Sequence, residues 1–115
     1  MNKNVQISML CEIYGKLLTE KQLDVLTDYY DKDFSLFEIG RDKGITRQAV
    51  RDMIKKGENK LFEFEEKLGI MKTRLRQEEK IGSVLAELLK IKDGVADNEV
   101  AEILTNIQEE LTFLH

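Results

Sequence analysis

The feature that most constrains the fold is a series of helix start and stop signals within residues 34–60. Ser35 can cap a helix, and Glu38, three residues later, can return the hydrogen bond in a capping box. Gly44 lies where that helix must end, because glycine adopts the left-handed backbone of a helix C-terminus without steric cost. Thr46 can cap a second helix directly afterwards. The stretch therefore predicts two helices joined by a tight turn.

Apolar residues at helical spacing can pack these two helices against each other. They are Ile39, Ile45, Val50, Met53 and Ile54. Gly40 is small at the point where the helices would cross. This combination is the sequence form of a helix-turn-helix motif.

The second helix of the predicted motif carries side chains suited to nucleic acid. In such a motif this helix can enter the major groove, where its early residues meet base edges. Arg can pair with guanine, Gln with adenine and Lys with phosphates. The candidate nucleic-acid-binding residues are Thr46, Arg47, Gln48, Arg51, Lys55 and Lys56. The alternative interpretation is a solvated helix face, because the fold does not guarantee the function.

Charge is distributed unevenly along the chain. Residues 46–60 hold five basic and two acidic side chains, whereas residues 19–38 hold six acidic and two basic ones. The whole chain has a net charge of −4, which counts against strong non-specific binding to nucleic acid. We expect the acidic stretch to repel phosphate, so that any binding is modest and falls steeply as salt rises.

Helical patterns continue on both sides of the motif and predict an all-α fold. One helix is expected within residues 5–18, and a capping box at residues 19–22 starts another. The second helix of the motif can continue to Leu68, with Gly57 marking a bend or a close packing contact. We expect a helix-turn-helix domain at residues 1–68 and a C-terminal helical extension at residues 69–115.

The extension contains two amphipathic segments, at residues 81–91 and 97–114. Apolar residues in the second segment follow steps of three and four, the spacing of a coiled-coil seam. They are Val100, Leu104, Ile107, Leu111 and Leu114. We expect them to be buried against the preceding helix or against a second chain. In the second case the protein would be a homodimer.

Residues for catalysis or metal binding are scarce. Cys11 is the single cysteine, and His115, the last residue, is the single histidine. They supply neither a metal site nor a nucleophile with its base, so we expect no enzyme activity, no metal and no cofactor. One cysteine excludes an internal disulfide and fits a reducing cytoplasm, and Cys11 in an apolar helix indicates a buried structural residue. No apolar run approaches a membrane span, and the first residues do not form a signal peptide.

Several short blocks within residues 7–68 match a known pattern. They are Leu18-Thr19-Glu20-Lys21-Gln22, Tyr29-Tyr30, Phe34-Ser35-Leu36, Glu38-Ile39, Thr46-Arg47-Gln48-Ala49-Val50, Asp52 and Ile54-Lys55. These blocks resemble the YlxM family of small bacterial helix-turn-helix proteins. The same stretch resembles, more loosely, the distal promoter-reading region of primary sigma factors. The chain departs from the family at Arg51 and Met53, where Tyr and Asn are usual, and Arg51 makes the helix more similar to the sigma region.

The resemblance implies an all-helical fold and a cytoplasmic protein. Because members are typically encoded beside the protein GTPase of the signal recognition particle, it also implies an accessory or regulatory role in that pathway. The partner would be the RNA of the particle or its GTPase. A sequence-specific DNA-binding transcription regulator is the alternative, and a motif used only for docking to proteins is a third.

Overall fold

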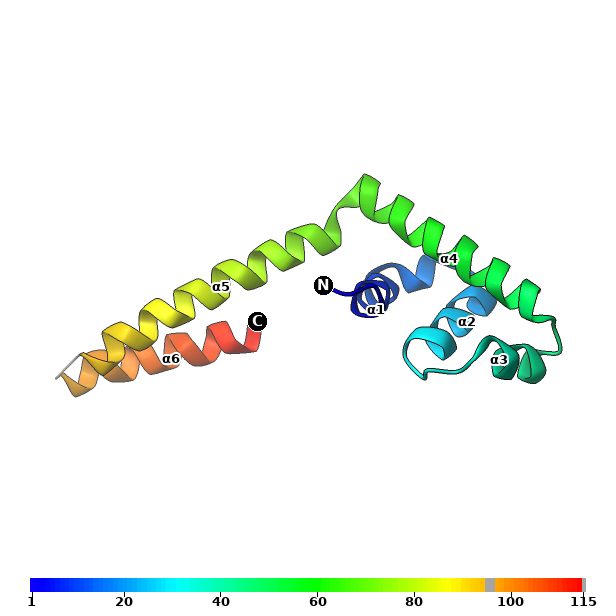
Figure 1. The fold of residues 1–115 in the computed structure, drawn as a ribbon. Helices are drawn as coiled ribbons and strands as arrows, with labels where there is room; N and C mark the ends of the chain where they lie inside the picture. The colour runs from blue at the N-terminus through cyan, green and yellow to red at the C-terminus, as the bar shows by residue number, and fades with distance from the viewer. Residues whose placement is uncertain (95–96, 115) are drawn as a thin grey trace. The chain divides into compact units, whose positions relative to one another are not determined.

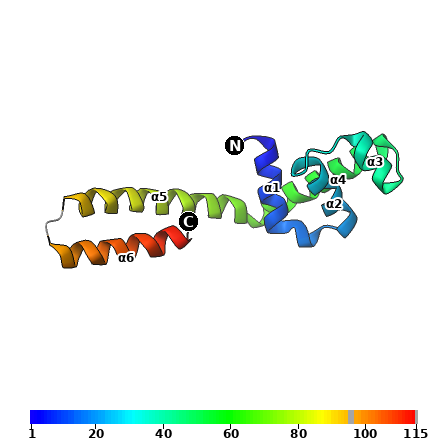
Figure 2. The same ribbon diagram turned by 90° about the horizontal axis from the view of Figure 1, so that it is seen from below.

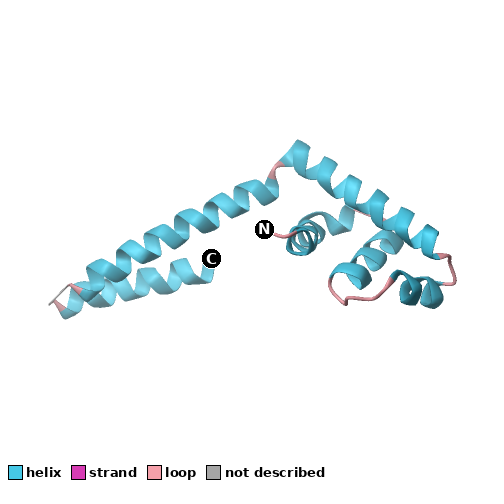
Figure 3. Ribbon diagram, viewed as in Figure 1, coloured by secondary structure: helices cyan, strands magenta, loops and turns pink. Residues whose placement is uncertain are grey.

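The computed structural model describes residues 1–94 and 97–114, and within these ranges the chain forms helices and no strand (Figure 1 and Figure 3). The predicted all-α class is confirmed. The helices are α1 (Lys3–Tyr14), the short 3₁₀ helix η1 (Gly15–Leu17), α2 (Glu20–Tyr30), α3 (Leu36–Lys43), α4 (Arg47–Leu68), α5 (Ile70–Asp93) and α6 (Asn98–Leu114). The chain divides into two compact units, Met1–Met71 and the remainder from Lys72 onward.

The predicted helix-turn-helix is formed by α3 and α4, and its caps are those expected from the sequence. Ser35 Oγ accepts a hydrogen bond from the Glu38 amide at 3.1 Å, and Glu38 Oε1 accepts one from the Ser35 amide at 3.3 Å. Gly44 ends α3 with a left-handed backbone of φ 70°. Thr46 Oγ1 accepts a hydrogen bond from the Ala49 amide at 3.0 Å and starts α4.

The core of the first unit lies where α1, α2 and α3 pack against α4. The largest fully buried side chains come from all four helices: Tyr14, Ile7, Leu10, Leu26, Ile39, Leu61, Val25 and Val50. Burial of one such aliphatic side chain stabilises the fold by roughly 1.5–3 kcal/mol. Of the residues expected to join α3 and α4, Ile39, Val50 and Ile54 are buried, whereas Ile45 and Met53 are half-buried.

Two glycines permit the close approach of helices in this core. A Cβ atom on Gly40 would lie 2.7 Å from the backbone oxygen of Ile45, and one on Gly57 would lie 2.8 Å from a methyl carbon of Leu26. Gly40 therefore occupies the crossing point, as predicted. Gly57 marks a close packing contact inside α4, which continues through it without interruption.

Side chains of α1 and α4 bind the first backbone amides of α5. The Tyr14 hydroxyl donates to Glu65 Oε1 at 2.7 Å and accepts from the Ile70 amide at 3.2 Å, while Glu65 Oε1 also accepts from the Met71 amide at 2.9 Å. Amides in the first turn of a helix have no partner within the helix, so these bonds replace an ordinary N-cap. Burial, and then the hydrogen bond to Glu65, raises the pKa of Tyr14.

In the second unit, α5 and α6 run antiparallel and side by side (Figure 1 and Figure 2). No side chain within residues 72–94 and 97–113 is fully buried. Leu104 and Leu111 of the predicted seam are half-buried, Ile107 is 39% exposed, and the side chain of Leu114 lies outside the described residues. The seam is therefore only partly covered.

The helix expected at residues 81–91 is longer than the apolar pattern indicated, because α5 begins at Ile70. Its first turns carry Lys72, Arg74 and Arg76, which are good helix formers but add nothing to an apolar stripe. Within the two described ranges, no helix has the length and apolar character needed to cross a membrane.

Cys11 is half-buried in α1. Burial raises the pKa of its thiol to about 11, and the negative charge of Asp31 contributes to the same shift. The thiolate is the nucleophilic form of cysteine, so this environment keeps Cys11 in its poorly reactive thiol form near neutral pH.

We predict that Gly40→Ala destabilises the first unit by about 1–3 kcal/mol, because the added methyl group would collide with the backbone at Ile45. Urea unfolding followed by circular dichroism measures the change. The matched control is Asp42→Ala, an exposed change on the same helix, which should alter the free energy of unfolding by less than about 0.5 kcal/mol. Equal urea midpoints for the two variants would contradict the packing described for Gly40.

Candidate nucleic-acid interface

One face of α4 is fixed in the core, and this determines where its other side chains lie. The buried stripe consists of Val50, Ile54, Gly57 and Leu61, spaced by three and four residues. Side chains on the opposite face of α4 are therefore directed away from the core. All six predicted site residues are exposed: Thr46, Arg47, Gln48, Arg51, Lys55 and Lys56.

Three of the predicted residues form a basic row along one side of α4. Arg47, Arg51 and Lys55 follow each other at intervals of four, so neighbouring side chains lie close together on the helix surface. Arg51 and Lys55 also line a cleft together with Tyr30. Lys56 is separated from the row, since adjacent residues are about 100° apart around a helix.

Gln48 is engaged by a partner that the sequence interpretation did not consider. Its side-chain amide donates to Asp52 Oδ1 at 3.0 Å, one turn further along α4. One of the two N–H groups of the Gln48 amide is therefore engaged, and Asp52 brings a negative charge to the exposed surface. The signal was available, because Gln and Asp four residues apart form a recognised helical pair.

Thr46 contributes mainly to local structure. Its hydroxyl oxygen accepts the capping hydrogen bond from Ala49, as described above. A hydroxyl also has one proton to donate, so Thr46 can still donate to a phosphate oxygen.

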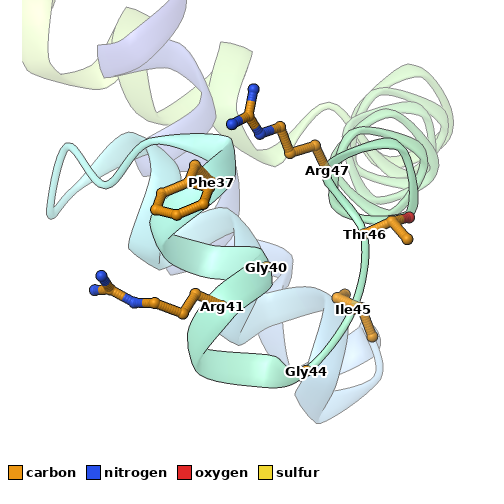
Figure 4. Close-up of a pocket in the computed structure, with 7 residues that line it drawn as sticks. All are labelled: Phe37, Gly40, Arg41, Gly44, Ile45, Thr46 and Arg47. Carbon is orange, nitrogen blue, oxygen red and sulfur yellow. The ribbon is translucent and has the colours of Figure 1, made fainter.

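The structure adds two residues of α3 to the neighbourhood of the basic row. Phe37 is 52% exposed, and its ring centroid lies 5.1 Å from the Arg47 guanidinium carbon and 5.8 Å from that of Arg41. Figure 4 shows the ring between these two arginines. All three residues line a cleft of about 500 Å³. The Phe37 and Arg41 pair, four residues apart, was the signal in the sequence.

Part of the acidity of α2 is neutralised within the first unit. Asp28 forms ion pairs with Lys32 at 3.5 Å and with Lys43 at 3.8 Å. On α4, Glu58 pairs with Lys3 at 3.3 Å and accepts a hydrogen bond from the Tyr30 hydroxyl. Burial, followed by the interaction with Glu58, raises the pKa of Tyr30, which therefore stays a hydrogen-bond donor at neutral pH.

Among the residues that the structure describes, no three His, Cys, Asp or Glu side chains gather closely enough to hold a metal ion. His115 lies outside that part of the chain.

The capped α3 and α4, the glycine turn and the exposed face of α4 define a helix-turn-helix protein. Comparison with known proteins then gives the family. A family model for YlxM / p13-like helix-turn-helix proteins, UPF0122, matches residues 1–103. This chain belongs to that family, as the sequence resemblance indicated.

Relatives with the family name have similar lengths. A UPF0122 protein of Clostridium botulinum is 42% identical over 99 residues, which cover 86% of this chain and 90% of the relative. One from Clostridium acetobutylicum is 34% identical over 111 residues, or 96% of each chain. One from Malacoplasma penetrans is 50% identical over 74 residues, which cover 64% of this chain and 69% of the relative.

We predict that Asp52→Asn strengthens binding of nucleic acid about two- to fivefold at low salt, because it removes a negative charge beside the basic row. Titration at low and high salt measures the effect, which should shrink as salt screens the charge. The matched control is Glu66→Gln, an exposed neutralisation near the other end of α4. Affinities that rise equally for both variants would show that only net charge matters.

Proposed function

We propose that this protein is a regulatory helix-turn-helix protein that binds nucleic acid through the basic row of Arg47, Arg51 and Lys55. The proposal rests on the exposure, the position and the ion pairing of these three basic side chains. They are exposed, lie on one side of a helix held firmly in the core, and form no ion pair within the described ranges. Cations kept unpaired in such a row are suited to a regularly spaced series of phosphates and base edges.

The RNA of the signal recognition particle is the ligand that we favour. This choice rests on the resemblance to the YlxM family, whose members are typically encoded beside the GTPase of the particle. Sequence-specific binding of promoter DNA is the second candidate, and Arg51 is the residue that favours it, since it replaces the usual Tyr of the family and increases the similarity to sigma factors. Either role would be carried out in the cytoplasm.

Electrostatics should make the binding moderate in strength. The net charge of −4 opposes the approach of a polyanion, while the basic row attracts it locally. Each phosphate contact releases counterions, so affinity should fall steeply as the salt concentration rises.

We expect Arg47→Ala to weaken specific binding by about 1–3 kcal/mol and to relax the preference at one base. Lys55→Ala should weaken all sequences alike and reduce the salt slope by about one. Titrations of the full chain with signal recognition particle RNA and with duplex DNA measure both effects. The control is Lys67→Ala, which removes an exposed lysine at the far end of α4.

Two results would count against this function. One is a lack of binding to either nucleic acid at low salt. The other is binding that the double change Arg47→Ala with Arg51→Ala leaves unaltered. The same face of α4 would then be better explained as a docking surface for a protein such as the GTPase.

We also propose that two copies pair through α5 and α6. Among the side chains that the structure describes from Lys72 onward, none is fully buried, and several large apolar residues are more than a third exposed: Val84, Leu89, Ile91, Val100, Ile103, Ile107 and Phe113. The charged residues of α6 are all acidic, whereas α5 has six basic and four acidic ones. Two such hairpins can cover their apolar faces in a four-helix bundle, with α6 of one copy beside α5 of the other.

We predict that light scattering gives twice the chain mass of 13.4 kDa at micromolar concentrations. Ile103 is exposed in the single chain and would lie in the apolar contact between two copies. Ile103→Asp should therefore shift the protein to the monomer, because it would bury a charged side chain in that contact. Asn106→Asp, which adds the same charge at an exposed polar position, is the control. A monomeric parent protein would exclude pairing.

A further inference from the structure

The ring of Phe37 is exposed in a place where the fold does not require an aromatic residue. It lies in the first turn of α3, and 52% of its surface is open to solvent, whereas Ile39 on the same helix is fully buried. Removing a large apolar ring from water is favourable, so its exposure beside the basic row indicates a surface that a ligand can cover.

The cleft next to Phe37 has one flat apolar wall and two cationic ones. Arg41 and Arg47 hold their guanidinium groups within 6 Å of the ring centroid, in the range of cation–π contacts. Figure 4 shows Phe37 between them, and Gly40 and Gly44 also line the cleft. A side chain on Gly40 would collide with the backbone oxygen of Ile45. The cleft therefore has no side chain at this position.

Both arginines remain able to bind an anion. Arg47 forms no ion pair with any residue that the structure describes, and its contact with Phe37 is a cation–π contact of 5.1 Å that engages no N–H group in a hydrogen bond. Arg41 has only a loose contact of 3.7 Å through Nε with Asp42, and both side chains are largely exposed. Such a surface ion pair contributes little, and the two terminal amino groups of Arg41 stay available.

These features match the chemistry of an unpaired nucleobase with its flanking phosphate. A nucleobase stacks on an aromatic ring or on a guanidinium plane, and an arginine fork binds the phosphate. A base inside a duplex has no free face to offer. Unstacked bases in loops and bulges are the usual targets of sequence-specific RNA recognition, which favours RNA as their source.

We propose that the Phe37, Arg41 and Arg47 cleft binds an unpaired nucleobase of an RNA loop. The inference rests on the proposed nucleic-acid binding. It adds a contact at the cleft to the contacts proposed for the basic row. Arg47 belongs both to the cleft and to the basic row, so a loop base on Phe37 would be followed by stem phosphates along Arg51 and Lys55. The protein would thus recognise the junction between a loop and its stem.

The test uses an RNA hairpin with a fluorescent base analogue in its loop, and a fully paired RNA duplex with the same stem. The parent protein should quench the analogue and bind the hairpin more tightly than the duplex. Phe37→Leu, which keeps an apolar side chain but removes the aromatic face, should weaken hairpin binding on the order of tenfold and abolish quenching. Its affinity for the duplex should fall less than its affinity for the hairpin, because Phe37 contacts only Arg47 of the basic row. Phe37→Trp should retain both properties.

The matched control is Phe62→Leu, because Phe62 is a partly exposed aromatic residue of α4 outside the cleft. Its hairpin affinity should equal that of the parent. Circular dichroism confirms that each variant is folded before it is titrated. A DNA hairpin of the same sequence serves as the second arm, and we expect it to bind more weakly than the RNA.

Each contrary result has a distinct meaning. Equal affinity for hairpin and duplex overturns the cleft proposal, as does a Phe37→Leu variant that behaves like Phe62→Leu. If Arg51→Ala still weakens the hairpin in that case, the proposed function stands without the cleft. Equal binding of the DNA hairpin overturns the choice of RNA. A parent protein that binds none of these nucleic acids overturns both the cleft and the proposed function.

Discussion

The burial of one stripe of α4 against α1, α2 and α3 is the interaction on which the rest of the first unit depends. Gly40 and Gly57 allow this burial, since each replaces a side chain that would collide with a neighbouring element. A helix held along one side by fully buried Val50 and Leu61 has little freedom to rotate. The exposed basic row is therefore presented in a fixed direction, although none of its members belongs to the core.

Local rules were sufficient to predict the start and end of the helix-turn-helix. The caps at Ser35 and Thr46 and the left-handed Gly44 depend on residues no more than four positions apart, so they can be read from a short window of sequence. The start of α5 was not predictable in this way. Its first amides are bound by Tyr14 and Glu65, and Tyr14 is more than fifty residues away along the chain.

The exposure of the proposed site residues was predictable from the sequence, whereas the surroundings of Phe37 were not. Helical period determines which side of α4 is exposed, and all six predicted residues lie there. The bond from Gln48 to Asp52 also follows from this period, because the two residues are four positions apart, although it was not among the predictions. Phe37 was not among the predicted site residues, and its exposure depends on the placement of α3 against α4.

The unequal charges of α2 and α4 give the first unit an electrical polarity. Lys60 of α4 lies 3.4 Å from Gln22, which places the acidic start of α2 beside the second half of α4, away from the basic row at its beginning. A molecule polarised in this manner rotates in the field of a polyanion before contact, with the first half of α4 turned toward it and Glu20 and Asp24 turned away. Such orientation acts during the encounter, so dissolved ions should slow the association of the complex more than they hasten its dissociation.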